Sequence, residues 1–371
     1  MKVWFVLGAP ADLFGGGEVF AVRLARWLKI RGHDVEVVVR PESLTGEAAR
    51  KAFLKVRELP LKNDIDVISR VRLKRWFRAA QPDAVIGAWG RDVKLSARAA
   101  KAAGAKVFWL QGTVLSNTSR SHRKLDAQFL DGYFVPSEFT KSQLAERGQI
   151  EPDRITVVYP GIDPEPFAPD VQAADRGDEF RRAYDIPPDS SVALCLSRLV
   201  EIKGHAHLLD AWAEVCRSLD QSVLVLAGSG PLDATLKARA TELGIADRVR
   251  FTGHIPDSRP ALWNADLLVL PSLEEPLGIV TLEGMAAGVA VVASRVGGIP
   301  EVVEDESSGL LVSPGDTSQL RDAMLRVLGD KEFRLRLVAS GRQRVEHFSA
   351  DQCFPKFEST IAPAESNPVC A

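Results

Sequence analysis

Charged residues that follow apolar, strand-like runs are the part of this sequence best suited to chemistry. Arg198 and Lys203 come after the run Val192–Leu196, and a guanidinium with a nearby ammonium is a common way to hold a diphosphate. The alternative is a pair of solvated surface charges. Glu275 and Glu283, eight positions apart, follow another apolar run. Glu275 would precede a helix, and Glu283 would lie about two turns along it.

That helix would expose backbone N–H groups of Leu277, Gly278 and Ile279 at its N-terminus. A carboxylate beside such groups can bind sugar hydroxyls and phosphate oxygens together. A solvated helix would also carry glutamates at this spacing without any function. The flanking proline, glycines and small residues favour the binding site.

Two glycine-rich turns repeat the strand–glycine–helix pattern. Phe14–Glu18 includes Gly16 and Gly17 after the first predicted strand, and Gly228–Pro231 includes Ser229 after a later one. Glycines let the backbone approach a ligand and leave N–H groups free at a helix N-terminus, which suits an anion or phosphate. Neither turn matches GxGxxG or a Walker A loop, and a plain strand–helix turn is the alternative for both.

No other residue pattern points to a cofactor. The six histidines show no metal-ligand spacing with nearby carboxylates, so we expect no metal. The four cysteines form no CxxC pair, which favours a reduced, cytoplasmic setting. No apolar run approaches the ~18 residues of a membrane span. Met1–Ala11 faintly resembles a signal peptide, but we interpret it as the start of a buried strand.

Strand-like and helical stretches alternate along the chain, which predicts two α/β units, each with a doubly wound parallel sheet, facing a central cleft. The proline-rich segment 161–190 interrupts the pattern and is interpreted as an interdomain connection. The predicted strands are Val3–Leu7, Val35–Val39, Ala84–Ile86, Lys106–Leu110, Gly132–Val135, Ile155–Val158, Val192–Leu196, Val223–Leu226, Val249–Phe251, Leu267–Leu270, Ala290–Val292 and Gly309–Val312. The predicted helices are Glu18–Arg31, Val93–Ala103, Glu138–Arg147, Gly204–Leu219, Leu232–Leu243, Gly278–Ala287 and Thr317–Leu328.

The 371 residues carry 47 Lys and Arg against 49 Asp and Glu, a net charge of -2. Residues 1–150 hold 26 basic and 15 acidic side chains, so the N-terminal part is basic and the rest acidic. The excess lies in Arg70–Arg78 and Ser119–Lys124. Either stretch could be the solvated face of a helix. The alternative is that it faces an anionic membrane surface or an anionic acceptor. Nucleic acid is not expected, because no reading helix or aromatic platform is visible.

Glu275 to Glu283 resembles the E-x7-E motif of retaining, nucleotide-sugar-dependent glycosyltransferases with the GT-B fold (family 4-like, glycosyl transferases group 1). The resemblance covers almost the whole chain. Further matches are Leu7-Gly8 with Gly15–Glu18, Arg31–Val35, Pro136–Phe139, Tyr159–Asp163, Arg198 with Lys203, Gly253–Ile255 and Gly297–Glu301.

The resemblance implies a role for each site residue. Arg198 and Lys203 would bind the donor diphosphate and stabilise the leaving nucleoside diphosphate without a metal. Glu283 would hold the ribose hydroxyls and Glu275 those of the donor sugar. The remaining expected contacts are the backbone at Leu277, Gly278 and Ile279, the loop at Ser229, the backbone near His254 for the base, and Gly16 and Gly17 closing over the diphosphate.

The resemblance also implies an acceptor-side domain at 1–165, a donor domain at 166–345, and a last helix in 346–371 that crosses back. The acceptor would be a glycan, a lipid-linked sugar or a polysaccharide precursor. Gln111 stands where the family often has His; it cannot act as a general base, yet it can still bond a sugar hydroxyl. A sugar-nucleotide epimerase and a non-catalytic glycan- or nucleotide-binding subunit are the alternatives.

Overall fold

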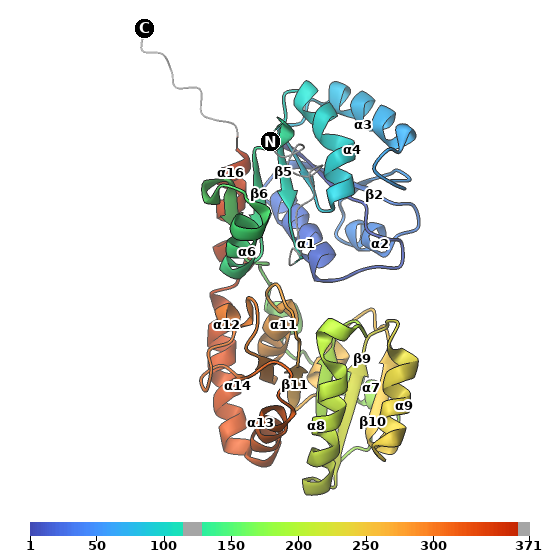
Figure 1. The fold of residues 1–371 in the computed structure, drawn as a ribbon, viewed down its shortest axis with the longest axis vertical. Coiled ribbons are helices and arrows are strands. Elements are labelled where there is room, and N and C mark those ends of the chain that lie inside the picture. Colours follow the sequence, from blue (N-terminus) through green and yellow to red (C-terminus); the bar gives the residue numbers. More distant parts are fainter. Residues whose placement is uncertain (114–127, 363–371) are drawn as a thin grey trace. The chain divides into compact units, whose positions relative to one another are not determined.

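The computed structural model describes residues 1–113 and 128–362, which form two compact units (Figure 1). Unit 1 comprises Met1–Gly161 and the C-terminal segment that begins at Ala350. Unit 2 comprises Ile162–Ser349. The domain boundaries expected after residues 165 and 345 stay predictions. The basic stretch Ser119–Lys124 lies outside the described residues.

Unit 1 is built on a parallel sheet whose described strands follow the order β3-β2-β1-β4-β5-β6-β7. The order reverses between β1 and β4, which are neighbours, so the chain builds the sheet outward in two directions from that point. The strands are β1 Lys2–Leu7, β2 Asp34–Val39, β3 Lys55–Glu58, β4 Ala84–Gly87, β5 Lys106–Leu110, β6 Gly132–Val135 and β7 Ile155–Val157. The helices are α1 Gly16–Ile30, α2 Leu44–Lys51, α3 Val67–Ala80, α4 Gly90–Ala102, α6 Glu138–Gly148, α15 Ala350–Cys353 and α16 Pro355–Ile361.

The central strand β1 is apolar on both faces because helices cover both. Trp4 points to one face, where its ring meets Phe77 of α3 edge-on at 5.4 Å between centroids. Phe5 points to the other face and stacks on Phe357 of α16 at 6.3 Å. An unbroken apolar run such as this is what a doubly covered parallel strand requires.

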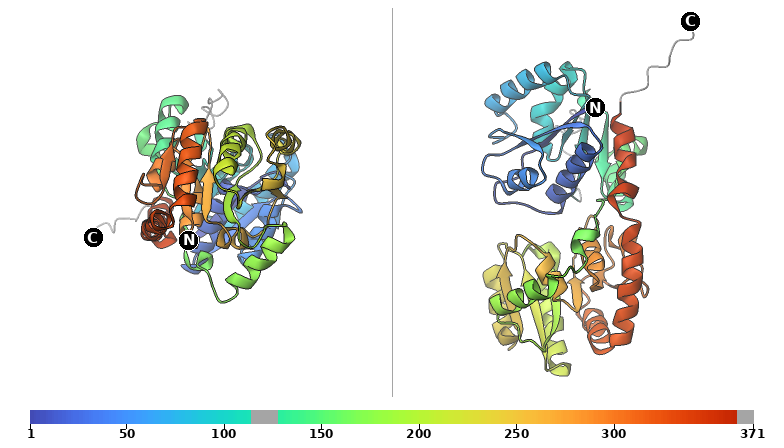
Figure 2. Two further views of the ribbon diagram at one scale, coloured as in Figure 1. Left: turned by 90° about the horizontal axis from the view of Figure 1, so that it is seen from below. Right: turned by 180° about the vertical axis from the view of Figure 1, so that it is seen from behind.

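The C-terminal helices α15 and α16 belong to unit 1, and Figure 2 shows α16 (red) alongside it. Phe357 is fully buried and its ring lies 4.5 Å from that of Phe134 in β6. Trp27 of α1 donates from its indole nitrogen to Asp351 at 2.9 Å. Buried aromatic side chains contribute strongly to the stability of such contacts, so α16 is an integral part of the unit 1 core.

Unit 2 has a second parallel sheet, with described strands in the order β10-β9-β8-β11-β12-β13. Here the order reverses between β8 and β11. The strands are β8 Ser191–Leu196, β9 Ser222–Ala227, β10 Val249–Gly253, β11 Leu267–Leu270, β12 Ala290–Ser294 and β13 Leu310–Val312. The helices are α7 Ala173–Ala183, α8 His205–Ser218, α9 Asp233–Glu242, α10 Arg259–Trp263, α11 Ile279–Ala287, α12 Ile299–Val302, α13 Thr317–Gly329 and α14 Lys331–Glu346.

The predicted strands and helices are all present, with ends that differ by a few residues at most. The interpretation of 161–190 as an interdomain connection is wrong for much of its length, since α7 lies within it and belongs to unit 2. The Arg176 guanidinium of α7 lies 4.8 Å from the Trp263 ring of α10. The sequence pattern also did not predict α2, β3, α10, α12, α14 or the full extent of α3.

Candidate functional site

The charged residues predicted to do chemistry in unit 2 gather where its strand order reverses. Arg198 and Lys203 lie in the loop after β8, and Glu275 lies in the loop after the neighbouring strand β11. At such a point the two connections leave toward opposite faces of the sheet and open a crevice beyond the strand ends. The site residues thus come from the position where an open parallel sheet binds ligands.

Glycine backbone brings these two loops into contact. Gly204 has a φ of +69°, and a Cβ there would overlap the Pro271 carbonyl oxygen. The loop after β11 also bonds the loop after β8 through its backbone, because Leu273 N donates to Ile202 O at 2.8 Å. Only glycine fits both the left-handed conformation and the close approach. Lys203, directly before Gly204, is therefore held against the loop that carries Glu275.

Lys203 and Glu275 form an ion pair, with Nζ 2.5 Å from Oε2. Only 15% and 11% of the two side chains are exposed. The Ser272 hydroxyl also donates to Glu275 Oε2, at 3.3 Å. Shielding from water strengthens such a pair, and removing either partner would leave the other charge buried. The sequence placed both residues in the site but did not predict that they touch.

The backbone around Glu275 is fixed from a third loop. Gly297, after β12, has a φ of +61°, and a Cβ there would overlap the Glu275 carbonyl oxygen. Gly298 N donates to the same oxygen at 3.2 Å. Three successive strand ends, those of β8, β11 and β12, therefore hold one carboxylate in place.

Helix α11 starts directly beyond this carboxylate. Its N-cap residue Gly278 has a φ of +90°, and a Cβ there would lie 3.1 Å from Leu270 Cδ2 and 3.2 Å from Ile299 Cγ1. Leu277 is buried, Ile279 is the first helical residue, and Glu283 lies half-buried one turn further on. The first N–H groups of this nine-residue helix have no partner within it, and their dipoles favour an anion.

Ser229 and His254 are exposed in the loops after β9 and β10. Gly228 N donates to Gly253 O at 2.9 Å, which ties these loops together. Leu199 N donates to Ser229 O at 3.0 Å, so the loop of Arg198 lies against that of Ser229. Arg198 itself is exposed and is not part of the ion pair of Lys203.

His205 supports the site from below, a role that sequence analysis did not assign. It is 1% exposed, and its Nε2 lies 3.0 Å from the Ser197 hydroxyl. Burial, and then the charge of Lys203, lower the pKa of His205 to about 4, so the imidazole is neutral at neutral pH. A neutral ring adds no competing positive charge under the loop of Arg198 and Lys203. No histidine spacing could have revealed this, because the environment alone sets the charge.

The predicted site residues of unit 1 lie at the carboxyl ends of β1 and β5. Gly16 and Gly17 begin α1, and Gln111 follows β5. Gln111 is 5% exposed, and its Nε2 donates to the hydroxyl of Thr113 at 2.9 Å. A Cβ on Gly112 would lie 3.5 Å from Gly17 Cα, so these two loops adjoin.

Trp89 and Asp92 lie at the same edge of unit 1, although no sequence pattern pointed to either. The Trp89 indole nitrogen donates to Glu18 Oε1 at 3.1 Å, and Gly15 N donates to Glu18 Oε2 at 3.0 Å. Asp92 is fully buried, and burial raises its pKa to about 7. A lone aspartate in the first turn of a helix looks solvent-exposed in sequence, so the pattern gave no signal.

The described residues contain neither a metal-binding cluster nor a helix that could span a membrane. Within residues 1–113 and 128–362, no three or more His, Cys, Asp or Glu side chains are grouped so as to hold a metal ion. No helix in the same part of the chain is long and apolar enough to cross a bilayer.

Comparison with solved structures identifies the fold. A glycosyltransferase from Rickettsia africae superimposes with a TM-score of 0.85, at 20% identity and with 97% of each chain covered. Anabaena Alr3699/HepE in complex with UDP-glucose gives a TM-score of 0.84, at 21% identity, covering 97% of this chain and 99% of that one. Two parallel-sheet α/β units with these structural neighbours constitute the GT-B fold.

Comparison of sequences gives the family. Residues 14–166 match the family described as Glycosyltransferase Family 4, and residues 177–344 match Glycosyl transferases group 1. A GDP-mannose-dependent alpha-(1-6)-phosphatidylinositol monomannoside mannosyltransferase of Mycobacterium tuberculosis is 32% identical over 317 residues, covering 83% of this chain and 78% of that protein. A D-inositol 3-phosphate glycosyltransferase of Saccharomonospora viridis is 36% identical over 232 residues, 59% of this chain and 52% of that protein. The chain belongs to the family 4, group 1 glycosyltransferases with the GT-B fold, as its motifs predict.

Proposed function

We propose that this protein transfers a sugar from a nucleotide-diphosphate sugar to a glycan, a lipid-linked sugar or a polysaccharide precursor, with retention of anomeric configuration. The observation that carries the proposal is the Lys203–Glu275 pair at the reversal point of the unit 2 sheet, beside the N-terminus of α11. An ammonium, a carboxylate and a row of backbone N–H groups are together suited to a ligand that carries both phosphate and hydroxyl groups. The mannosyltransferase of Mycobacterium tuberculosis is named for GDP-mannose, and the Anabaena structure is bound to UDP-glucose, which supports a donor of this class.

In this proposal Lys203 and Arg198 bind the diphosphate and stabilise the charge that develops on it as the sugar leaves. Glu275 binds hydroxyls of the donor sugar, and Glu283 binds those of the ribose. The backbone at Leu277, Gly278 and Ile279 and the loops at Ser229 and His254 complete the donor contacts. The proposed reaction uses no metal, because these positive groups would stabilise the charge that develops on the leaving group.

The proposed bond changes balance without a further reactant. The bond from the sugar C1 to the phosphate oxygen breaks, and the bond from C1 to the acceptor oxygen forms on the same face. The proton of the acceptor hydroxyl passes to the departing phosphate. Gln111 acts as a hydrogen-bonding group for a sugar hydroxyl rather than as a base, since an amide cannot take the proton.

Gly17 supports a ligand contact from unit 1. A Cβ on Gly17 would meet no atom within 4 Å, and Gly17 does not have a positive φ. Neither packing nor backbone conformation therefore requires glycine there. Close approach of a diphosphate to the Gly16–Gly17 backbone is a reason that remains.

The test begins with a panel of UDP-, GDP- and ADP-sugars scored by thermal stabilisation. A donor that binds the folded state raises its melting temperature by linkage. Glu275→Gln should abolish the stabilisation, whereas the exposed neighbour Glu274→Gln should keep it. The same shift in both variants would contradict the assignment of Glu275.

Turnover is then measured with the stabilising donor and the acceptors of the named relatives, a phosphatidylinositol monomannoside and D-inositol 3-phosphate. NMR of the product gives its anomeric configuration, and an inverted product would refute retention alone. Conversion of the donor to an epimer without an acceptor would favour the epimerase. Donor binding without any turnover would favour the non-catalytic subunit.

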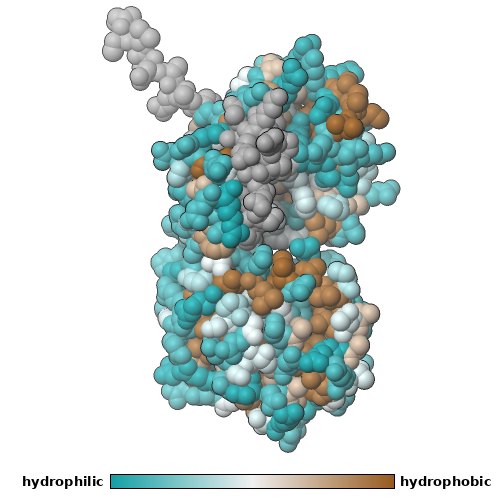
Figure 3. All heavy atoms as spheres, viewed as in Figure 1, coloured by the Kyte–Doolittle hydropathy of each residue, from teal (hydrophilic) through white to brown (hydrophobic). Residues whose placement is uncertain are grey.

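We also propose that unit 1 docks on an anionic membrane surface from the cytoplasmic side. Four large apolar side chains at the start of α3 are strongly exposed: Ile65 at 72%, Val67 at 69%, Ile68 at 58% and Val71 at 61%. Figure 3 shows a hydrophobic patch in this region of unit 1. The exposed basic side chains beside it are Arg70, Arg72, Lys74, Arg75 and Arg78.

Only part of the basic stretch Arg70–Arg78 is available to contact a membrane. Leu73 and Phe77, within the basic stretch, are fully buried in the unit 1 core and cannot touch a bilayer. The membrane-facing set is the exposed apolar residues 65–71 with the flanking cations, a combination typical of interfacial binding to anionic lipid.

Vesicle co-sedimentation tests the docking proposal, with phosphatidylcholine alone and with added phosphatidylglycerol. Binding should require the anionic lipid, weaken with salt and fall in the double variant Ile68→Glu, Val71→Glu. Leu335→Glu in unit 2, at a side chain 55% exposed, is the matched control and should bind normally. Binding that ignores lipid charge and salt would refute the proposal.

A further inference from the structure

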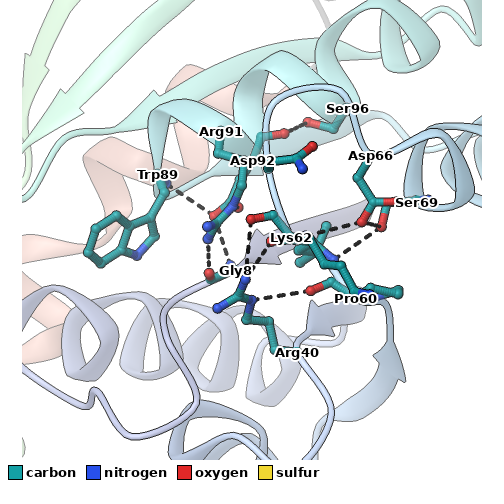
Figure 4. Close-up of polar contacts among 12 residues, drawn as sticks. Gly8, Arg40, Pro60, Lys62, Asp66, Ser69, Trp89, Arg91, Asp92 and Ser96 are labelled. Carbon is teal, nitrogen blue, oxygen red and sulfur yellow. Dashed lines mark hydrogen bonds and ion pairs between the residues drawn. The ribbon is translucent and has the colours of Figure 1, made fainter.

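One buried carboxylate, that of Asp92, joins two loops at the point where the unit 1 strand order reverses (Figure 4). Asp92 lies in the first turn of α4, after β4, and its Oδ2 accepts from Trp89 N at 3.2 Å. The same oxygen accepts from Gly8 N at 2.8 Å, and Gly8 directly follows β1. One oxygen atom thus bonds the loops after both central strands.

The contact is shaped on both sides. A Cβ on Gly8 would overlap Asp92 Oδ1, so the close approach requires glycine. Arg91 donates from Nη2 to the Gly8 carbonyl oxygen, and its Nε lies 3.6 Å from Asp92 Oδ1. Consecutive residues of α4 therefore hold the N–H and the C=O of Gly8 at once. We call Gly8, Trp89, Arg91 and Asp92 the loop junction.

The loop junction continues to the glycine turn through Trp89. Its backbone N–H donates a hydrogen bond to Asp92, and its indole nitrogen donates one to Glu18. Glu18 in turn accepts from Gly15 N, directly before Gly16 and Gly17. An unbroken series of hydrogen bonds leads from a fully buried carboxylate to the turn that the proposed function places against the donor.

We propose that Asp92 is a positioning residue for the reaction, which holds the Gly15–Glu18 turn and Trp89 in the arrangement that transfer needs. It touches neither substrate itself. Loss of the carboxylate frees Gly8 and the Trp89 backbone together, so the turn loses its fixed position. The inference rests on the proposed function for its kinetic consequence, but the hydrogen-bond series can be tested without any substrate.

The chemistry favours a specific geometry over simple filling of space. Removing one partner of a buried hydrogen bond leaves the other unsatisfied, and Gly8 N and Trp89 N would both lose their acceptor in Asp92→Ala. An amide oxygen can accept from both donors, so Asp92→Asn should preserve the junction. Small displacements of a positioning group far from the reacting bond can cost large factors in rate.

The experiment compares Asp92→Ala, Asp92→Asn and the control Ser96→Ala in the full chain. Ser96 is buried one turn further along α4 and bonds only the Asp92 carbonyl oxygen. Hydrogen–deuterium exchange should rise in residues 8–18 of Asp92→Ala, and remain as in the parent in the other two variants. Equal exchange in Asp92→Ala and the parent would overturn the hydrogen-bond series, whatever the enzyme's activity.

The kinetic arm uses the donor and acceptor that give turnover with the parent. Asp92→Ala should lower kcat by about tenfold or more, while the affinity for the free nucleoside diphosphate changes less than about threefold, because most of its proposed contacts lie in unit 2. Asp92→Asn should restore most of kcat. Full activity of Asp92→Ala, or no rescue by Asp92→Asn, would refute the positioning role.

A second variant covers failure of Asp92→Ala to fold. Trp89→Phe keeps the backbone bonds to Asp92 and removes only the indole donor to Glu18. Its exchange should rise in residues 15–18 but not at residue 8, and its kcat should fall. Absence of turnover in the parent with every donor would defeat the proposed function, and the exchange results would still decide the inference.

Discussion

The buried carboxyl of Asp92 gives a prediction whose size follows from the structure. Burial raises its pKa from an ordinary 3.8 to about 7, against the lowering effects of the Gly8 and Trp89 N–H groups and of Arg91 and Arg40. The unfolded chain releases this proton near pH 4, whereas the folded chain keeps it until about pH 7. Folding stability should therefore decrease as pH rises from about 4 to about 7, and then stay level for this group.

The expected magnitude is large. A difference of about three pKa units corresponds to about 4 kcal/mol at 1.36 kcal/mol per unit. Asp92→Asn mimics the neutral acid at every pH. The variant should match the parent in free energy of unfolding near pH 4 and exceed it by up to about 4 kcal/mol above pH 7.

Urea unfolding between pH 4 and 8, followed by tryptophan fluorescence, measures this difference. Five of the seven tryptophans lie in unit 1, so the signal is weighted toward the unit that holds Asp92. Asp12→Asn, at an exposed carboxyl of the same unit, is the control and should show no comparable gain at high pH. A difference between Asp92→Asn and the parent that does not change with pH would refute the argument from burial.

Three further predictions concern other contacts. Gly17→Ala should leave the free energy of unfolding unchanged or raise it by up to about 1 kcal/mol, because alanine favours helix and its Cβ meets no atom there. Donor turnover should nevertheless fall. An equal loss of stability and turnover would contradict a ligand role for Gly17. Lys203→Met should lower the free energy of unfolding by about 3 kcal/mol, because it leaves Glu275 charged and without its ammonium partner. Adding Glu275→Gln should recover most of this stability in a denaturation assay. The double variant should still be inactive in a turnover assay. Phe357→Ala should cost about 3–5 kcal/mol of unit 1 stability, while the exposed Leu335→Ala should cost little; similar losses would mean that α16 is not part of the core.

The strands could be predicted from sequence almost to the residue because they are apolar on both faces. Lys106–Leu110 and Leu267–Leu270 have the predicted bounds, since a polar or turn residue ends each run. Helix α3 was harder to predict. Its buried residues are Ser69, Leu73 and Phe77, and Trp76 and Ala80 are partly buried against the core. Most of its other side chains are charged or exposed, so its apolar periodicity is weak.

Neighbouring strands, rather than motifs, determined which site residues meet. Lys203 and Glu275 are 72 positions apart, and each has its own sequence signal. Their contact depends on β8 and β11 being adjacent, although β9 and β10 lie between them in the chain. Sequence order alone would have paired the end of β8 with that of β9.

In unit 1 the sequence is even less informative about which residues meet, because the residue that joins its loops belongs to no motif. Asp92 is one acidic residue in the first turn of an amphipathic helix, a position that favours carboxylates in general. Its burial arises from the adjacency of β1 and β4 and from the missing side chain at Gly8.

Both units thus place a carboxylate where the strand order reverses, but with different surroundings. Glu275 is paired with Lys203 and lies beside the N-terminus of α11, which has no side-chain cap, whereas Asp92 accepts from backbone N–H groups of its own chain. The first arrangement suits binding and the second suits support, so an equivalent place in two similar sheets can serve two different roles.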